Sequence, residues 1–284
     1  MYRNYFYSKR VHLKDVFTSD KVKEELSNFK NIQNGGTLTT FYKDTQVCTV
    51  EVSDIYYNFD FSGFCKNILD EIVKYFVPEK FSISCKDGVQ EIRLVGGQIF
   101  IDMEEYKKMI SIINSTDKTR ALCMSVGLQK VSNNSCTIMT YFSNKHYKSS
   151  LPDKIKEFTE NLKNFNMDID FHVKTIEDLK NKNVSIKDFL KNIMFKEDKL
   201  MKSVELKMRA LGKTLVFSYG QRAHYSLLMN IEQNRYNKYE DFVISAKTLY
   251  DAYAEVFNTD DTSVISRETR RIIEALDKCE DQRH

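Results

Sequence analysis

The 284-residue chain is predicted to be an α+β protein, with an antiparallel sheet and helices in its N-terminal half and an all-helical C-terminal half. Turn signals between alternating segments recur up to about residue 175, and helical periodicity continues from residue 176. Two prolines and nine glycines are too few for an all-β fold. Strands followed by helices therefore predict a mixed domain over 1–175 and a helical region over 176–284 packed on it.

The first elements are predicted to alternate between helix and hairpin. Residues 13–30 carry apolar side chains at helical spacing, and the Asn-Gly-Gly of 34–36 ends that helix. Thr- and Val-rich segments at 37–42 and 45–52 predict a β-hairpin. Apolar residues recurring every three to four positions over 64–76 predict a second helix, which stops before the first proline.

The next stretch predicts a meander, a helix and a second hairpin. Asp87-Gly88 and Gly96-Gly97 are turn signals, and Tyr106, Met109, Ile110 and Ile113 follow helical spacing. Ser132-Asn133-Asn134 indicates the turn of the later hairpin. The expected bounds are strands at 80–85, 89–95 and 98–103, a helix at 106–113, and strands at 120–130 and 135–142.

After residue 150 the pattern becomes mainly helical. Pro152 suits the first turn of a helix, and the alternation over 167–173 predicts one last strand. From Ile176 onward the periodicity predicts helices only, with breaks near residues of low helix propensity. These helices are expected at 176–181, 185–211, 221–234, 238–257 and 263–280.

The chain carries no motif that indicates enzymatic chemistry, so we expect no enzyme, no metal and no cofactor. Its glycine pairs lack phosphate-loop spacing, and its five histidines form no ligand pair. The six cysteines are widely spaced and fall at apolar positions, which indicates buried thiols in a reducing compartment. Without a long apolar run or a signal-peptide core, we expect a cytoplasmic protein with no membrane partner.

The most informative feature is the segregation of charge. Residues 1–14, 118–152 and 206–231 contain no Asp or Glu, yet they carry four, five and four Lys or Arg side chains, although the net charge of the whole chain is only +3. Each stretch also contains several Tyr or Phe residues. Cations contact phosphates and aromatic rings stack on bases, so this combination is typical of single-strand binding. Charges in a last helical turn also favour the helix dipole, which explains Lys207 and Arg209 without a ligand.

We therefore predict a non-enzymatic protein that binds nucleic acid, preferably single-stranded, through the N-terminal segment and the loops of 118–152. Six cations are expected to contact phosphates and three rings to stack on bases: Arg3, Lys9, Arg10, Arg120, Lys145 and Lys148, with Tyr5, Tyr7 and Tyr147. The alternative is a phage structural or host-interaction protein that forms homo-oligomers, or binds a host protein, through its helical half. The cations would then only make the surface soluble.

The segment 101–128 resembles the centre of the phage and plasmid-like proteins called domain of unknown function 932. The family has a short apolar helix ending in Asn-Ser, a turn, and then a strand of small and apolar residues, which the residues up to Asn114-Ser115, the turn over 115–118 and the residues up to Leu128 match here. The His and Gly that the family has in this turn are absent here. The resemblance implies a phage or mobile-element origin, hence the host cytoplasm, and no catalytic residues.

Overall fold

The structure is a computed structural model in which the chain forms two compact units. Unit 1 comprises 1–99, 106–129 and 140–169, and unit 2 comprises 100–105, 130–139 and 170–284. The division predicted near residue 175 stays a prediction. The residues described are 3–5, 9–11, 16–52, 59–86, 88–115, 121–144, 151–196, 199–200, 210–211, 243–259 and 261–282; side chains are not described for 3–5, 9–11, 86, 141, 144, 151, 194–196 and 199–200.

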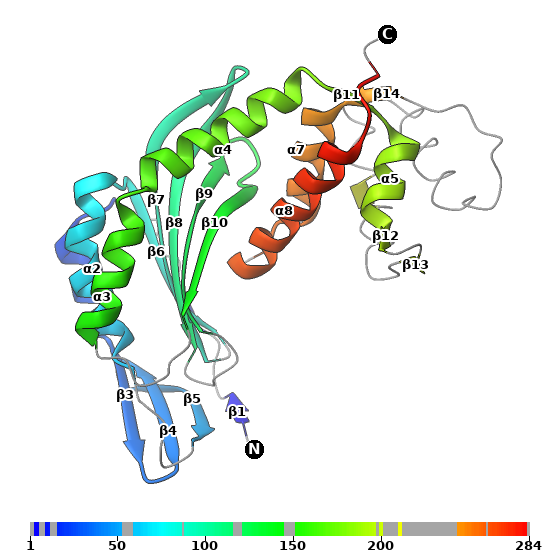
Figure 1. The fold of residues 1–284 in the computed structure, drawn as a ribbon. Helices are drawn as coiled ribbons and strands as arrows, with labels where there is room; N and C mark the ends of the chain where they lie inside the picture. Colours follow the sequence, from blue (N-terminus) through cyan, green and yellow to red (C-terminus); the bar gives the residue numbers. More distant parts are fainter. Residues whose placement is uncertain are drawn as a thin grey trace. The chain divides into compact units, whose positions relative to one another are not determined.

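Unit 1 begins with a four-stranded antiparallel sheet in the order β1-β5-β4-β3 (Figure 1). The predicted hairpin of β4 and β5 is confirmed, but the helix predicted over 13–30 is shorter and is followed by a strand. The elements are β1 (Arg3–Tyr5), α1 (Ser19–Ser27), β3 (Phe29–Asn34), β4 (Thr37–Tyr42) and β5 (Thr45–Glu51).

The second sheet of the fold has six strands in the order β10-β9-β8-β7-β6-β2. Strands β6 to β10 follow one another as a meander, and β2 pairs with the outer edge of β6. The predicted hairpin of β9 and β10 is confirmed. The strands are β2 (Lys9–Val11), β6 (Lys80–Lys86), β7 (Val89–Ile101), β8 (Glu104–Ser115), β9 (Leu122–Lys130) and β10 (Cys136–Asn144).

Two helices of unit 1 lie side by side, α2 (Phe61–Tyr75) and α3 (Leu151–Leu162) (Figure 1). Both were predicted from their periodicity. Asp60 caps α2 by accepting a hydrogen bond from the Gly63 amide, and Phe64 of α2 meets Phe158 of α3 edge to face with ring centroids 5.0 Å apart. The helices are therefore joined by an aromatic core.

Unit 2 contains most of α4 (Phe165–Lys180) and three further described helices. Helices α7 and α8 pack together, and the Tyr253 hydroxyl of α7 donates a 2.7 Å hydrogen bond to Glu268 of α8. Short strand pairs join β11 to β14 and β12 to β13. The elements are β11 (Asn183–Ser185), α5 (Ile186–Met194), β12 (Phe195–Lys196), β13 (Lys199–Leu200), β14 (Val243–Ser245), α7 (Ala246–Val256) and α8 (Thr262–Lys278).

The prediction of an all-helical C-terminal half is wrong. Antiparallel pairing of β11 with β14 places the buried Val184 opposite the buried Ile244, and β12 pairs with β13. The helix expected over 185–211 ends at Met194 for the same reason. Strands of two or three residues are too short to leave a periodic signal. The helix expected over 221–234 lies outside the described residues.

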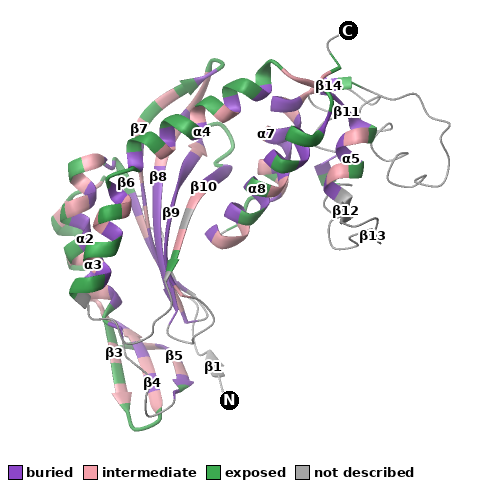
Figure 2. Ribbon diagram, viewed as in Figure 1, coloured by how far each residue is buried: buried purple, intermediate pink, exposed green. Residues whose placement is uncertain are grey.

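Two elements of the N-terminal half also differ from the prediction. Residues 106–113 belong to strand β8 and not to a helix, whereas 167–173 belong to helix α4 and not to a strand. Every residue from Met109 to Ser115 is buried, and so is every residue from Leu122 to Leu128 in the neighbouring β9 (Figure 2). A strand covered on both faces shows no alternation, so its apolar spacing can imitate a helix.

Gly96 and Gly97 do not form the predicted turn, because both lie inside β7. A Cβ atom at Gly96 would lie 2.5 Å from the Glu79 amide nitrogen and 2.9 Å from the Val77 carbonyl oxygen. Gly97 has φ +66°, which favours glycine. The pair therefore allows the preceding segment to approach the strand backbone closely.

We expect Gly96→Ala to lower the free energy of unfolding by about 2–3 kcal/mol, because the contacts of the new methyl group are with backbone that cannot rotate away. Urea denaturation followed by circular dichroism measures this loss. Gly36→Ala is the matched control, since its Cβ would meet only the Val52 carbonyl oxygen at 3.3 Å. Equal stability of the two variants would contradict the proposed crowding at Gly96.

Candidate nucleic-acid interface

The nine predicted contact residues are only partly placed by the structure. The backbones of Arg3 and Tyr5 lie in β1, and those of Lys9 and Arg10 lie in β2. Both strands form sheet edges, β1 beside β5 and β2 beside β6. The side chains of these four residues, and the whole of Tyr7, Arg120, Lys145, Tyr147 and Lys148, lie outside the described part.

Burial explains part of the acid-free stretch 118–152. Seven consecutive residues of β9, from Leu122 to Leu128, are buried, and so are 135–138 at the start of β10. A carboxylate at these positions would lose its hydration, so acids are excluded there whatever the function. Burial does not explain the cations at the ends of this stretch, so these cations still indicate a binding function.

A cleft opens beside the junction of the two sheets of unit 1. Phe29 packs there against a buried cluster of Tyr42, Val47 and Cys85, which belong to β4, β5 and β6. The two sheets therefore meet at this cluster. The cleft has a volume of about 250 Å³ and is lined, among the described residues, by Phe29, Lys30, Asn31, Asp60, Ser62 and Gln90.

Gln90 is the unusual member of this lining. Gln90 is only 3% exposed, and its side-chain Oε1 atom has no hydrogen-bond partner among the described residues. Leaving a buried carbonyl oxygen unpaired costs about 1–3 kcal/mol, so such groups are rare unless a water or a ligand satisfies them. Gln90 is therefore a lining residue of the cleft whose buried acceptor the described fold leaves unsatisfied.

The other polar groups of the cleft divide into those held by the fold and those available. Asp60 caps α2, and the Ser62 hydroxyl donates a 2.5 Å hydrogen bond to the Leu26 carbonyl oxygen. The Asn31 side-chain oxygen accepts from the Thr40 hydroxyl at 2.9 Å. This bond leaves the Asn31 NH₂ group as a donor, so the cleft offers both a donor and an acceptor beside the half-buried ring of Phe29.

Residues of the cleft lining lie in the same register rows as residues of the predicted N-terminal contact segment. Lys9 pairs with Cys85, which pairs with Gln90, so the backbones of Lys9 and Gln90 are two strands apart, or roughly 10 Å. On the other sheet, one register row contains Tyr5, Cys48, Thr40 and Asn31. The cleft therefore shares register rows with both β1 and β2.

Sequence reasoning missed the cleft, although one signal was present. By the two-residue period of a strand, Gln90 shares a face with Ile92 and Leu94, and all three are buried. A polar residue on the apolar face of a strand marks a place where the core needs a hydrogen-bonding group. Asn31 gave no such signal, because strand β3 itself was not predicted.

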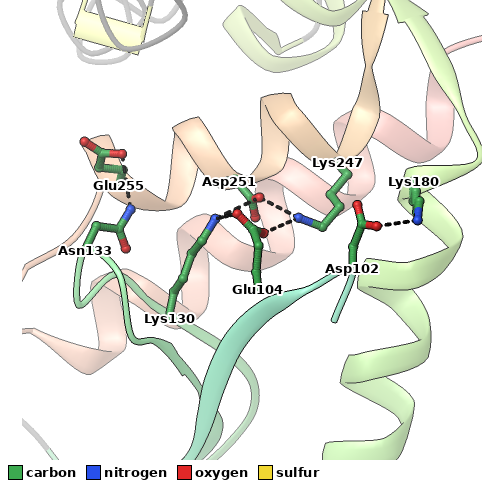
Figure 3. Close-up of polar contacts among 8 residues, drawn as sticks. All are labelled: Asp102, Glu104, Lys130, Asn133, Lys180, Lys247, Asp251 and Glu255. Atoms are coloured by element: carbon green, nitrogen blue, oxygen red, sulfur yellow. Dashed lines mark hydrogen bonds and ion pairs between the residues drawn. The ribbon is translucent and has the colours of Figure 1, made fainter. Parts of the chain in front are cut away.

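Unit 2 holds a separate network of four charged side chains (Figure 3). Lys130, the last residue of β9, contacts Glu104 of β8 at 2.5 Å and Asp251 of α7 at 3.1 Å. Lys247 of α7 contacts the same two carboxylates at 2.5 and 2.7 Å. Each lysine therefore bridges both acids, and the network holds α7 against the ends of the two strands.

The pKa shifts of Glu104 and Lys247 in this network indicate a structural role. Burial works to raise the pKa of Glu104, but hydrogen bonds from Lys130 and Lys247 outweigh it and lower that pKa to about 2. Burial likewise works to lower the pKa of Lys247, and the charge of Asp251 with hydrogen bonds to both acids raises it instead. At neutral pH the carboxylate and the ammonium group are both charged, so this site supplies neither a general acid nor an amine nucleophile.

His172 of α4 is buried beside Tyr250 of α7, with 3.1 Å between His172 Nε2 and the Tyr250 hydroxyl. Its Nδ1 atom has no partner among the described residues. Burial lowers the pKa of His172 to about 3, because the charged imidazolium would lose its hydration there. The histidine is thus neutral and structural at physiological pH.

The remaining candidate groups give no sign of catalysis. All six cysteines are buried thiols, and burial raises the pKa of the Cys65 and Cys279 thiols, which keeps both protonated and unreactive. Across the described ranges, no three His, Cys, Asp or Glu residues cluster as metal ligands would. None of the described helices is long and apolar enough to cross a membrane.

Comparison of the chain with protein-family models, with curated proteins and with solved structures finds no match.

We expect Asp251→Asn to destabilise the protein by about 1–3 kcal/mol, less than for a fully buried pair because the Glu104 side chain remains and is 36% exposed. Two lysines that are 10% and 8% exposed would then share a single carboxylate. Urea denaturation at pH 7 measures the loss. Glu160→Gln, in the exposed pair with Lys163, is the control and should leave stability unchanged. Equal effects of the two substitutions would contradict the structural role of the network.

A second expectation concerns acid. Because the pKa of His172 falls from 6.5 in the unfolded chain to about 3 in the folded one, the unfolded state binds the extra proton first. Stability is complete above about pH 6.5 and declines as the pH falls, by roughly 2 kcal/mol at pH 5. Unfolding curves of the parent and His172→Gln from pH 7 to pH 5 test this. Identical pH slopes would show that His172 is not buried in the neutral form.

Proposed function

We propose that this protein is a non-enzymatic nucleic-acid-binding protein that prefers single strands. The observation that carries the proposal is charge segregation: a chain with a net charge of +3 concentrates cations and aromatic rings in stretches without a single acid. Phosphates attract the cations at long range, and base stacking on rings is tolerant of sequence. Duplex DNA hides the faces of its bases, so stacking favours single strands.

The position of the N-terminal segment supports this proposal. Residues 1–14 contribute β1 to one sheet of unit 1 and β2 to the other. The backbones of 3–5 and 9–11 therefore lie at two sheet edges, and they share register rows with Asn31 and Gln90 of the cleft lining. An extended strand of nucleic acid that follows residues 1–14 would pass from phosphate-binding cations to a polar cleft.

The resemblance of residues 101–128 to domain of unknown function 932 adds a proposed origin. On that basis the protein acts in the cytoplasm of a host cell as a phage or mobile-element product. In this chain residues 104–115 form strand β8, whereas the resemblance rests on an apolar helix in the family. The free, buried cysteines fit a reducing compartment.

The test is fluorescence anisotropy of a labelled single-stranded oligonucleotide titrated with the parent protein at several salt concentrations. We expect binding at low salt and a weaker affinity for the matching duplex. The Lys145→Ala/Lys148→Ala double variant should flatten the log–log salt slope by about one to two units, because each phosphate contact contributes about 0.7 on single strands.

Tyr147→Ala should act differently from the lysine variant. Loss of a stacked base weakens binding by roughly five- to a hundredfold, and this loss should persist at high salt. Lys163→Ala, which removes an exposed cation outside the acid-free stretches, is the control and should bind like the parent. If the parent does not bind at low salt, or if the Lys145/Lys148 and Tyr147 variants bind as the parent does, the proposed function is wrong.

A further inference from the structure

We propose that the cleft between the two sheets of unit 1 binds a single unstacked nucleobase. This inference deepens the proposed function, on which it rests, by assigning a base-binding site that the sequence did not reveal. The cleft is the place in unit 1 where an unpaired buried acceptor, a donor and an aromatic ring occur together.

The size of the cleft suits one base. Pockets that enclose a drug-sized ligand measure about 300–1,000 Å³, and this cleft, at about 250 Å³, falls just below that range. It therefore accommodates one or two fused rings and not two stacked bases. Because the cleft is partly open to solvent, a base can enter while its sugar and phosphate stay outside.

The polar groups match the edge of a base. Every nucleobase carries an N–H donor next to a ring nitrogen or carbonyl acceptor, and amide side chains recognise such pairs with two hydrogen bonds. Here the Gln90 carbonyl oxygen is the unpaired acceptor and the Asn31 NH₂ group is the available donor. Since all four bases present this pattern on some edge, the site should tolerate sequence.

The surroundings supply stacking and charge. Phe29 is held by Tyr42, with ring centroids 4.9 Å apart, and by its packing against the buried cluster that Tyr42 forms with Val47 and Cys85. The Tyr42 hydroxyl donates to Glu25 at 2.8 Å, which fixes this aromatic wall. Lys30 follows Phe29 on the rim and is exposed, so it can meet the phosphate of the bound nucleotide.

The unpaired oxygen of Gln90 gives the inference a distinctive signature. Gln90→Met keeps the length of the side chain but removes the buried polar groups, so the variant should be as stable as the parent or more stable. The same change should weaken binding of a base. A residue that served only the fold would not combine gained stability with lost affinity.

The experiment measures binding of deoxyadenosine monophosphate and of 2-deoxyribose 5-phosphate to the full chain by calorimetry, with thermal unfolding recorded in parallel. We expect the nucleotide to bind at least about tenfold more tightly than the sugar phosphate, because only the nucleotide carries a base that stacks and hydrogen-bonds. Gln90→Met should weaken nucleotide binding by roughly three- to tenfold without lowering the melting temperature.

Two further variants complete the design. Phe29→Leu removes the ring and should weaken nucleotide binding by roughly fivefold or more, which keeps the test valid if Gln90→Met fails to fold. Ser125→Ala is the matched control, because Ser125 also carries a buried oxygen without a partner among the described residues but lies in β9, away from the cleft lining. It should bind the nucleotide like the parent.

The outcomes separate this inference from the proposed function. If the parent binds oligonucleotides but the two phosphates bind alike, or Gln90→Met and Phe29→Leu bind as the parent does, the base site is wrong and the proposed function stands. If the nucleotide binds in the cleft but oligonucleotides do not bind, the proposed function is wrong and the base site stands. If neither binds, both are wrong.

Discussion

Burial of both faces of the meander at β8 and β9 is the constraint on which the rest of unit 1 depends. Consecutive buried residues from Met109 to Ser115 and from Leu122 to Leu128 leave no position for an unpaired charge on these strands. The five cations of the acid-free stretch 118–152 all lie outside these buried runs in the sequence. Close packing of a different origin restricts Gly96 of β7, where the backbone of 77–79 occupies the space of a side chain. Burial thus explains part of the charge segregation. Only the cations at the two ends of the stretch 118–152 serve as evidence for a function.

Charged side chains do occur at the ends of β8 and β9 in unit 2, and there each one pairs with groups of opposite charge. Lys130 and Lys247 each contact Glu104 and Asp251, so two buried ammonium groups face two carboxylates. His172 remains neutral in the same unit. In both cases the polar side chains contact other side chains of the same unit and have a structural role. Gln90 differs, because its buried oxygen without a partner in the described chain belongs to a residue that lines a cleft, and this combination is the basis of the proposed ligand site.

Sequence reasoning succeeded where turn residues bound an element or where only the helical period fits its apolar residues, and failed where the apolar spacing also fits the wrong period. The hairpins β4–β5 and β9–β10 and helices α2 and α3 follow their turn signals and apolar periods. In α4 the buried positions are at helical spacing: Phe165, Ile169, His172, Ile176 and Leu179. The exposed Met167 and Phe171 nevertheless completed a false alternation. The predicted cations and rings rest on composition, whereas the cleft requires β3 and β7 to meet in space, which no local pattern encodes.

Ultraviolet cross-linking of an oligothymidylate to the parent protein, followed by mass spectrometry of tryptic peptides, tests the central claim most directly. A base held in the cleft lies against Phe29 and Gln90, and the strand that carries it passes along the N-terminal segment. The account predicts cross-links within residues 1–30 and 87–93, suppressed by an excess of unlabelled single strand and not by duplex. Cross-links confined to the helices of unit 2, or none at all, would contradict it.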